Sequence, residues 1–341
     1  MTSAPRVTVA GAGVLGLSTA LALADAGARV TVHDPGGPNA SSVAAGMIAP
    51  AFEAVLDATA RPHFDLLMAA RDHWPWFAER AGIALDRSGA MAVGEADWLA
   101  TLAAGFAALH LRPTEVGGDT ARSLAPGLSE AVDRALLTRE DWRVDAPAAL
   151  AALVRAAEAA GVIFRPEPVR ERGDADVLIV ATGAHGRHLA DLAPELAGLN
   201  PVKGHIVRVA APSAGAVVRA RSVYAAPGAS MVFGATMEHG RADVAVDEQV
   251  AGPLLAAGLD LFPACRDAPV QVAAGVRAAT ADGLPMVGPA AAPGVLLAVG
   301  ARRNGWLLAP LVARTITACV TGRDLGPHAA RFDPARFSRT S

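Results

Sequence analysis

A glycine-rich turn near the amino terminus constrains the fold more than any other feature of this sequence. A run suited to a buried strand, Arg6–Ala10, leads into Gly11, Gly13 and Gly16 in the order G-x-G-x-x-G. An apolar, alanine-rich helical pattern follows, and a second strand pattern covers Arg29–His33. Strand, glycine turn, helix and strand together predict a βαβ unit that binds a dinucleotide. Taken alone, the glycines are equally compatible with a simple tight turn.

Each glycine has a separate role in such a site. Gly11 allows a tight turn off the strand, Gly13 lets the backbone approach a pyrophosphate, and Gly16 lets helix and sheet pack closely. The helix directs its free N–H groups and positive dipole end at the phosphates. Asp34, 18 residues after Gly16, can accept hydrogen bonds from ribose hydroxyls. An acid there disfavours NADP, whereas this stretch alone does not separate NAD from FAD.

The bulk composition excludes several classes of protein. A chain of 341 residues exceeds the about 250–300 residues at which single cores stop growing, so we expect two lobes. A net charge of −3, 18% charged residues and no Lys/Arg run predict no nucleic-acid partner. The apolar run 306–320 is broken by Pro310 and Arg314, so we expect no membrane span. Cys265 and Cys319 lack metal-type spacing, which predicts no metal site and a reducing cytoplasm.

The remaining strand patterns indicate two sheets. The continuous apolar run 175–181 is typical of a parallel strand covered on both faces, and another buried strand is predicted over 294–300. Strands over 201–209 and 217–236 are predicted to run antiparallel in a second lobe, and 271–277 is a further strand.

Helical patterns separate these strands. Helices are predicted over 61–82, around 97–109 and over 243–262, and Gly305 is expected to open the closing helix. A further helix is predicted over 145–160, with its first residue as the N-cap. The change of pattern after residue 82 indicates that a second domain is inserted into the first.

Seven stretches then occur in an order that is typical of one family. They are Gly11–Gly16 with an acid at Asp34, Ser41-Ser42 with Ala44-Ala45-Gly46-Met47, Ala181-Thr182-Gly183, Pro201-Val202-Lys203-Gly204, Gly234-Ala235-Thr236-Met237, Arg277 before Asp282-Gly283-Leu284-Pro285, and Arg303-Asn304-Gly305 before Leu308-Ala309-Pro310. With these stretches, over about residues 6–321, the chain resembles the D-amino-acid-oxidase-like flavoproteins. Within them it is most similar to glycine oxidases of the thiamin-biosynthesis type. The resemblance favours FAD over NAD.

The resemblance implies an α/β fold with two domains. One is a Rossmann-like, glutathione-reductase-like FAD-binding domain, and the other is an inserted substrate domain with a mixed or antiparallel sheet. The FAD-binding domain is expected to comprise residues 1–82, 144–200 and 272–325, and the substrate domain residues 83–143 and 201–271. Neither cysteine lies in a recognisable attachment motif, so the FAD is expected to be non-covalent.

The resemblance assigns the substrate site to four residues. Arg277 would bind the substrate carboxylate, which suits a planar guanidinium with two parallel donors. Tyr224, the only tyrosine, would orient that carboxylate, Arg303 would help to hold it beside the flavin, and Met237 would line the cavity. The two arginines are therefore expected to face one cavity. The alternatives are an interdomain salt bridge for Arg277, core packing for Tyr224 and Met237, and simple solvent exposure for the Arg302/Arg303 pair.

The resemblance assigns a larger set of residues to the cofactor. They are Gly11, Ala12, Gly13, Val14, Leu15, Gly16, Asp34, Ser41, Ser42, Ala45, Gly46, Met47, Val169, Ala181, Thr182, Gly183, Arg302, Asn304, Gly305, Trp306 and Leu307. Asp34 replaces the glutamate that is commoner in the family. The histidines at 33, 185, 188 and 205 form no catalytic or metal constellation, so structural roles are expected for them. Ala225, Ala226 and Ala229 offer no polar group to a substrate, which leaves its side chain open.

The function that the resemblance implies is oxidation of a small amino acid to its imine. Glycine is the first candidate substrate, with sarcosine or a D-amino acid as alternatives, and oxygen would be reduced to hydrogen peroxide. Water would release the 2-oxo acid, or the imine would feed thiazole synthesis. The rivals are a dehydrogenase of the same fold with another electron acceptor, an FAD-binding scaffold without catalysis, and an NAD protein. The family is often tetrameric, and the sequence leaves the oligomeric state open.

Overall fold

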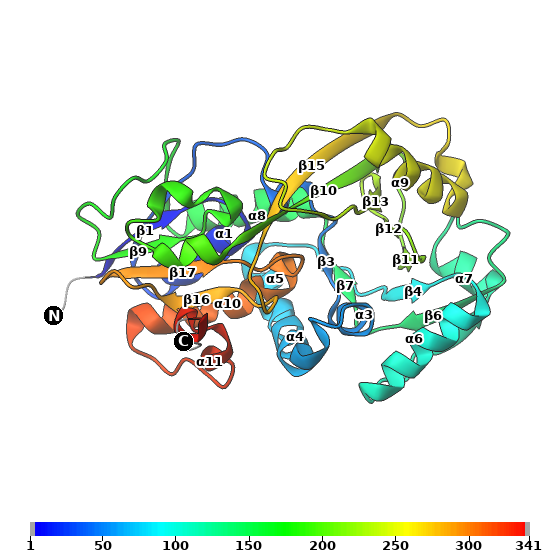
Figure 1. Ribbon diagram of the computed structural model, residues 1–341, viewed down its shortest axis with the longest axis horizontal. Coiled ribbons are helices and arrows are strands. Elements are labelled where there is room, and N and C mark those ends of the chain that lie inside the picture. Colours follow the sequence, from blue (N-terminus) through cyan, green and yellow to red (C-terminus); the bar gives the residue numbers. More distant parts are fainter. Residues whose placement is uncertain (1–3, 338–341) are drawn as a thin grey trace.

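The computed structural model describes residues 4–337 and contains two sheets in two lobes (Figure 1). The smaller sheet lies in one lobe with the two ends of the described chain, and the larger sheet fills the other lobe. The long strands β10 (Asn200–Val209) and β15 (Val270–Ala279) run from the middle of the molecule into the second lobe. The α/β class expected from the sequence is confirmed.

Six strands of the described chain form the smaller sheet in the order β16-β17-β9-β1-β2-β8. All neighbouring pairs are parallel except β16 with β17, which is antiparallel. The strands are β1 (Arg6–Ala10), β2 (Arg29–His33), β8 (Ile163–Arg165), β9 (Val177–Val180), β16 (Met286–Pro289) and β17 (Val295–Val299). The pattern analysis missed β16, a four-residue edge strand with glycine and proline in its second half.

The larger sheet contains nine strands within residues 4–337, in the order β14-β10-β13-β12-β11-β4-β6-β5 with β15 added against β10. Its pairs are antiparallel except β11 with β4, so the sheet is mixed as expected. The strands not yet bounded are β4 (Ala90–Ala92), β5 (Thr114–Gly117), β6 (Arg134–Thr138), β11 (Val217–Arg219), β12 (Tyr224–Ala226), β13 (Met231–Gly234) and β14 (Glu238–His239). A separate pair joins β3 (Met47–Ile48) to β7 (Trp142–Arg143).

The domain boundaries stay a prediction, and one strand crosses them. Strand β15 belongs to the larger sheet, because it pairs with β10 from Asn200 with Ala279 to Val209 with Val270. The boundary expected after residue 271 therefore falls inside a continuous strand. This strand leads from the larger sheet back toward the smaller one (Figure 1).

The helices cover both sheets. They are α1 (Val14–Asp25), α2 (Ala40–Val43), α3 (Pro50–Leu56), α4 (Phe64–Asp72), α5 (Trp74–Ala81), α6 (Ala96–Ala108), α7 (Gly118–Leu124), α8 (Ala146–Ala159), α9 (Glu248–Leu261), α10 (Gly305–Thr321) and α11 (Ala329–Phe332). Helix α8 confirms the expected cap, since Asp145 accepts a hydrogen bond from the N–H of Ala148.

Two helix predictions were wrong in extent. The helix expected over 61–82 is divided into a short 3₁₀ turn, α4 and α5, because Pro75 lacks an N–H group and lies in the first turn of a new helix that begins at Trp74. The helix expected from residue 243 begins at Glu248, where Asp247 caps it by accepting from the N–H groups of Gln249 and Val250. Asp243 instead forms ion pairs with basic side chains outside the helix.

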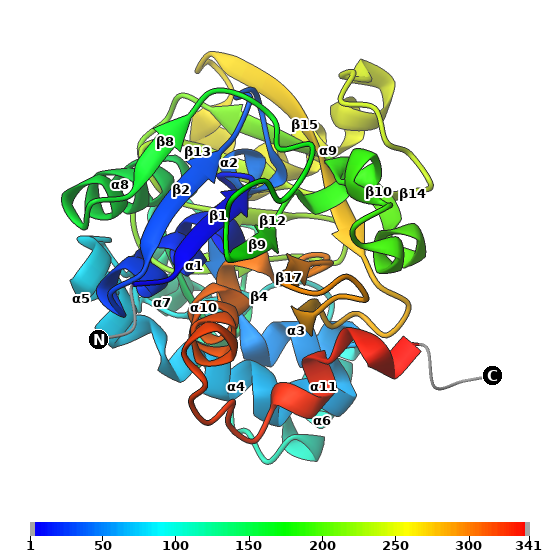
Figure 2. The same cartoon turned by 90° about the vertical axis from the view of Figure 1, so that its left-hand side faces the viewer.

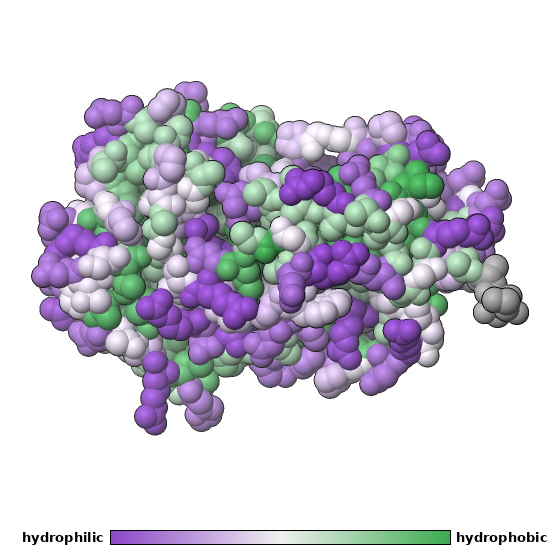
Figure 3. Space-filling model, turned by 180° about the vertical axis from the view of Figure 1, so that it is seen from behind, coloured by the Kyte–Doolittle hydropathy of each residue, from purple (hydrophilic) through white to green (hydrophobic). Residues whose placement is uncertain are grey.

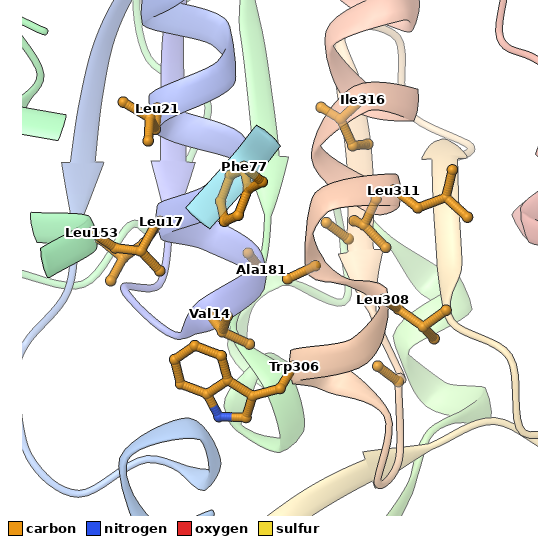
Figure 4. Packing of buried hydrophobic residues seen from close by; sticks show 14 of the residues in the cluster. Val14, Leu17, Leu21, Phe77, Leu153, Ala181, Trp306, Leu308, Leu311 and Ile316 are labelled. Atoms are coloured by element: carbon orange, nitrogen blue, oxygen red, sulfur yellow. The ribbon is translucent and has the colours of Figure 1, made fainter. Parts of the chain in front are cut away.

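Helices α1 and α10 lie side by side over the smaller sheet and form the centre of the largest apolar cluster (Figure 4). Val14 and Leu17 from α1 and Trp306 and Ile316 from α10 are each at most 4% exposed. Burial of such side chains stabilises the fold by roughly 1.5–3 kcal/mol each. Val14 and Trp306, near the amino-terminal ends of the two helices, lie at the same end of the pair (Figure 4), and Figure 2 shows α1 and α10 as neighbours from the side of the smaller sheet.

The polarity of the surface and the length of the described helices bear on whether the chain could span a membrane. On the face in Figure 3, hydrophobic and hydrophilic residues are interspersed. Within residues 4–337, none of the helices is long and apolar enough to span a bilayer.

Candidate functional site

A cavity of about 380 Å³ lies where the parallel strands of the smaller sheet end. The carboxyl ends of such strands are where α/β sheets bind nucleotides. Segments that follow β1, β2, β9 and β17 line the cavity together with residues from β15. Of the residues predicted to bind the cofactor, those that line it are Gly11, Gly13, Val14, Leu15, Asp34, Ser41, Val169, Ala181, Thr182, Gly183, Arg302 and Gly305.

The three glycines of the first turn meet different surroundings. Gly11 has a φ of +107°, and a Cβ there would lie 2.6 Å from the carbonyl oxygen of Ala181. A Cβ on Gly16 would lie 2.0 Å from the carbonyl oxygen of Gly11. A Cβ on Gly13 would meet only the Ser41 hydroxyl, at 3.3 Å, and would otherwise occupy the cavity. Gly11 and Gly16 are therefore required by the protein itself, whereas Gly13 keeps space free for a ligand.

Asp34 joins the glycine turn to the end of β2. Its Oδ2 accepts a hydrogen bond from the N–H of Ala12 at 2.6 Å, and its Oδ1 accepts from the N–H of Gly36 at 2.7 Å. The side chain also lines the cavity. A carboxylate has about four acceptor positions, so two bonds to the backbone leave others for ribose hydroxyls. An open glycine cradle, a helix N-terminus and an acid after the second strand fit the chemistry of a dinucleotide.

A second cavity of about 220 Å³ lies beside the first. Arg277 lines both cavities. Tyr224, Met237 and Arg303 line the second one, so all four residues predicted for the substrate site face one space. It also contains Ala45, Met47 and Asn304, which were predicted for the cofactor. The dinucleotide cavity and the cavity with the predicted substrate residues therefore meet at one guanidinium.

Arg277 extends from β15 across β10. Its Nη1 donates to the carbonyl oxygen of Thr236 at 3.3 Å. A Cβ on Gly204 would lie 2.4 Å from the same Nη1, so this glycine makes room for the guanidinium. Burial lowers the pKa of Arg277, and the neighbouring Arg303 acts in the same direction. Within residues 4–337, no carboxylate lies at ion-pair distance from Arg277.

Tyr224 begins β12, opposite the end of β13. A Cβ on Gly234 would lie 2.1 Å from the Tyr224 hydroxyl oxygen, so the paired strand leaves space for the phenol. Burial raises the pKa of Tyr224, although Arg277 and Arg219 act against this rise. The hydroxyl is therefore protonated at neutral pH and can donate a hydrogen bond to a carboxylate.

The Arg302/Arg303 pair is not simply exposed to solvent. Arg303 donates from Nε and Nη2 to Glu53 at 3.1 and 2.7 Å, and from Nη2 to Asp57 at 3.1 Å. Arg302, whose φ is +51°, forms a short ion pair with Asp57. The hydrogen bond from Arg302 lowers the pKa of Asp57, although burial acts in the opposite direction. The pKa of Arg303 is raised, chiefly by Glu53. Sequence patterns missed both acids, which lie about 250 residues from their partners.

A further arginine in this cavity was missed. Arg219, at the end of β11, is 7% exposed and lines the second cavity. It donates from Nη2 to the sulfur of Met47 at 3.3 Å, and its guanidinium lies 5.2 Å from the centre of the Phe52 ring. Its Nε is buried without a hydrogen-bond partner among the described residues. No sequence motif indicates Arg219 as a site residue, because its position in the cavity depends on the strands that surround it.

Asp141 anchors the helix that carries Glu53. The carboxylate is 1% exposed and accepts from the N–H groups of Ala51 and Phe52 at 2.8 and 3.1 Å. It therefore binds the amino-terminal turn of α3, where free N–H groups await partners. Burial raises the pKa of Asp141 to about 6, although Arg219 and the two backbone bonds oppose the rise.

Replacing Asp141 with asparagine is expected to reduce the pH dependence of stability between about pH 4 and 6. The folded pKa lies above the unfolded value of 3.8, so the stabilisation is complete below about pH 4 and is lost as the pH rises through about 6. Asparagine keeps an acceptor for the helix but has no such proton. Denaturant unfolding at a series of pH values measures this, and equal pH slopes in both proteins would contradict it.

Six predicted cofactor residues lie outside both cavities. Ala12 donates its N–H to Asp34. The Ser42 hydroxyl accepts from the N–H of Asn39 and donates to the carbonyl oxygen of the same residue, just before α2. Gly16 and Gly46 are needed where a Cβ would strike a backbone carbonyl. Trp306 donates from its ring nitrogen to the Ser41 carbonyl, and the carbonyl of Leu307 accepts from Trp74. These six residues support the walls of the site rather than lining them.

Three of the histidines occupy positions that the sequence did not predict. His33, His185 and His188 line the dinucleotide cavity. The Nε2 of His188 lies 2.9 Å from the carbonyl oxygen of Val169, which holds the loop after β8 against the cavity. His205 is fully buried in β10, away from both cavities.

Known proteins match this chain over nearly its whole length. A family model described as FAD dependent oxidoreductase matches residues 6–319. A glycine oxidase of Pseudomonas aeruginosa is 30% identical over 97% of this chain and 98% of its own length. A putative thiamine biosynthesis oxidoreductase ThiO of Rhizobium etli is 33% identical over 90% of this chain and 94% of its own. The crystal structure of glycine oxidase from Geobacillus kaustophilus superposes with a TM-score of 0.82 at 28% identity, covering 97% of this chain and 99% of that one.

Proposed function

The chain belongs to the FAD dependent oxidoreductase family, and from that premise we propose that it oxidises a small amino acid to the corresponding imine. The expected dependence on FAD is confirmed by this membership. Glycine is the first candidate substrate, as the names of the P. aeruginosa and G. kaustophilus proteins suggest.

The observation that carries the proposal is the shared guanidinium. Arg277 lines the dinucleotide cavity and the smaller cavity that contains Tyr224 and Arg303. A carboxylate bound there would lie where the two cavities meet. A polar group held at the junction is what a reaction between a cofactor and a small zwitterion requires.

The carboxylate of the substrate would be bound chiefly by Arg277. Its guanidinium makes one bond to a backbone carbonyl and has donors left over. Tyr224 would donate its hydroxyl proton to the same carboxylate. Arg303 has two of its nitrogens bound to acids, so it would contribute only its remaining Nη1, which lies 3.8 Å from the sulfur of Met237.

When bound, FAD supplies an acceptor for two electrons from the substrate. The protein's task is to hold the carboxylate so that the α-carbon hydrogen faces that acceptor, and to provide positive potential near it. The overall balance for glycine is glycine, oxygen and water giving glyoxylate, ammonia and hydrogen peroxide. The thiamine role in the name of the R. etli protein would use the imine before water reaches it.

The cofactor would be held without a covalent bond. Cys265 is buried in the apolar cluster of the larger sheet, and Cys319 lies on α10 beside a different cavity. Neither thiol lines the two cavities of the site. Release of free FAD from the denatured holoenzyme would support this arrangement.

The proposal is tested by mixing the holoenzyme with glycine, sarcosine and D-alanine in the absence of oxygen. We expect the flavin absorption band to bleach with at least one of them, and peroxide to form when air is admitted. Bleaching without peroxide would indicate a dehydrogenase with another acceptor. A flavin that no small amine reduces would reject amino acid oxidation and favour a scaffold.

A further inference from the structure

We propose that Arg219 forms a second anion site in the substrate cavity, and that the substrate is a small amine with two carboxylates. This inference rests on the proposed function, because Arg277 is taken to bind the carboxylate next to the reacting carbon. Arg219 would then bind a second carboxylate on the same molecule.

The charges around the cavity support this assignment. Its lining contains the arginines 219, 221, 277 and 303 but only one acid, Glu53. Arg303 and Glu53 neutralise each other through a direct ion pair, and the side chain of Arg221 is 62% exposed. Among residues 4–337, neither Arg219 nor Arg277 forms an ion pair. Two guanidiniums without carboxylate partners therefore face one space.

The surroundings of Arg219 keep it charged and poorly satisfied. A guanidinium stays protonated in proteins, and burying it without a carboxylate is unfavourable unless other groups compensate. The guanidinium of Arg219 contacts the sulfur of Met47 and lies near the rings of Phe52 and Tyr224. Asp141, which interacts electrostatically with Arg219, is bound to backbone N–H groups of α3, and no hydrogen bond joins it to Arg219 within residues 4–337. The buried Nε has no partner in the described chain.

Tyr224 connects the two guanidiniums. Both Arg277 and Arg219 act on the pKa of its hydroxyl, and the guanidinium of Arg219 lies 5.9 Å from the centre of its ring. A ligand that spans the cavity would thus have one carboxylate at Arg277, the phenol along its length and the second carboxylate at Arg219. A monocarboxylic substrate such as glycine would leave Arg219 without an anion.

Two kinds of amine have the required chemistry. One is an α-amino dicarboxylic acid such as aspartate, and the other carries its second carboxylate on the nitrogen, as iminodiacetate does. In both cases the reaction is the one already proposed, with loss of two electrons and two protons from the C–N unit to oxygen. The second carboxylate takes no part in the chemistry and only selects the substrate.

The test compares ligands with one and two carboxylates on the holoenzyme. Malonate and succinate are titrated against acetate and propionate by the change in flavin absorbance, and iminodiacetate and both enantiomers of aspartate are compared with glycine as anaerobic reductants. We expect the dicarboxylates to bind about 10- to 100-fold more tightly, as one additional charged hydrogen-bonded contact would predict. Equal affinities of mono- and dicarboxylates in the unaltered protein would overturn the assignment.

Variants then locate the effect. Arg219→Met, which keeps the packing but removes the charge, is expected to bring the affinity ratio close to one, and Arg219→Lys is expected to retain part of it. Arg221→Met, at the exposed rim of the same cavity, serves as the matched control and should keep the full ratio. An equal loss of affinity for both ligand classes in Arg219→Met would show a structural role instead. If Arg219→Met fails to bind FAD, the assignment is still tested by Arg219→Lys and by the affinities of mono- and dicarboxylates for the unaltered protein.

The outcome is distinguishable from that of the proposed function. If dicarboxylates bind through Arg219 while no amine bleaches the flavin, the anion site stands and amino acid oxidation falls. If glycine bleaches the flavin while dicarboxylates bind no better than acetate, oxidation stands and the second anion site falls.

Discussion

Replacing Arg277 with alanine is expected to raise the dissociation constant for the amino acid by about 100- to 1,000-fold. Removing the charged partner of an enclosed ion pair costs about 2–5 kcal/mol, and each 1.4 kcal/mol is tenfold. Arg277 has no acid partner in residues 4–337, so its removal leaves no buried carboxylate behind and should spare the fold. The constant is measured from flavin reduction at increasing amino acid concentration without oxygen.

Two further variants make this result specific to the guanidinium. Arg277→Lys keeps the charge but loses the two parallel donors. Its dissociation constant for the amino acid is therefore expected to lie between those of the unaltered protein and Arg277→Ala. Arg266→Ala removes an arginine whose side chain is 60% exposed and which pairs with Asp260 at the surface, and it should leave the dissociation constant unchanged. An Arg277→Ala protein that binds FAD and glycine normally would refute the carboxylate role.

Alanine at Gly16 and alanine at Gly13 are expected to fail in different ways. The Cβ of Gly16→Ala would lie 2.0 Å from the Gly11 carbonyl, so helix α1 would have to shift against the sheet. We expect a loss of about 3 kcal/mol or more in the free energy of unfolding, in the range of strained core substitutions. The Cβ of Gly13→Ala would meet only a hydroxyl at 3.3 Å, so the apoprotein should fold. It should nevertheless lose FAD, because the added methyl occupies the space in which a pyrophosphate would lie.

Thermal unfolding of the apoproteins and the flavin content of the purified holoproteins separate the two effects. Gly252→Ala is a suitable control, because it lies on the exposed side of α9 with nothing within 4 Å of the added Cβ. Because Gly252 precedes Pro253, whose ring disfavours a Cβ on the residue before it in a helix, no gain in stability is expected, but this variant should keep its flavin. A Gly13→Ala protein with full flavin content would show that the cofactor does not approach the turn closely.

The glycine turn was predictable because its function is local. Gly11, Gly13 and Gly16 are placed by the chain within one strand, one turn and one helix, and their spacing reflects the backbone conformations that this turn needs. The same reasoning holds for the cap at Asp145, whose hydrogen bond reaches only three residues along the chain. The strands β1, β2, β9 and β17 of the smaller sheet were predictable for the same reason, because each is a short run rich in β-branched and apolar residues.

The two errors in helix extent arose where a single side chain outweighed the hydrophobic periodicity. The helix expected over 61–82 is interrupted because Pro75 lies in the first turn of a new helix, although the apolar pattern continues on both sides. The helix expected from residue 243 begins later because Asp243 reaches the buried Lys203 of β10, at 2.6 Å, instead of entering the helix. In each case a single side chain decided a boundary that hydrophobic periodicity could not indicate.

The sequence by itself determined the βαβ unit that forms the dinucleotide site. Through an ordered set of motifs it also indicated the family and four candidate substrate residues. Only the tertiary structure decided what surrounds those residues. It paired Arg303 with Glu53 across about 250 positions, and among residues 4–337 it left Arg219 and Arg277, which line the same cavity, without an acid at ion-pair distance. Backbone turns leave a signature in neighbouring residues because their conformation is set within a few bonds. The charge balance of a cavity leaves none, because it depends on which distant strands and helices the packing of the whole chain brings together.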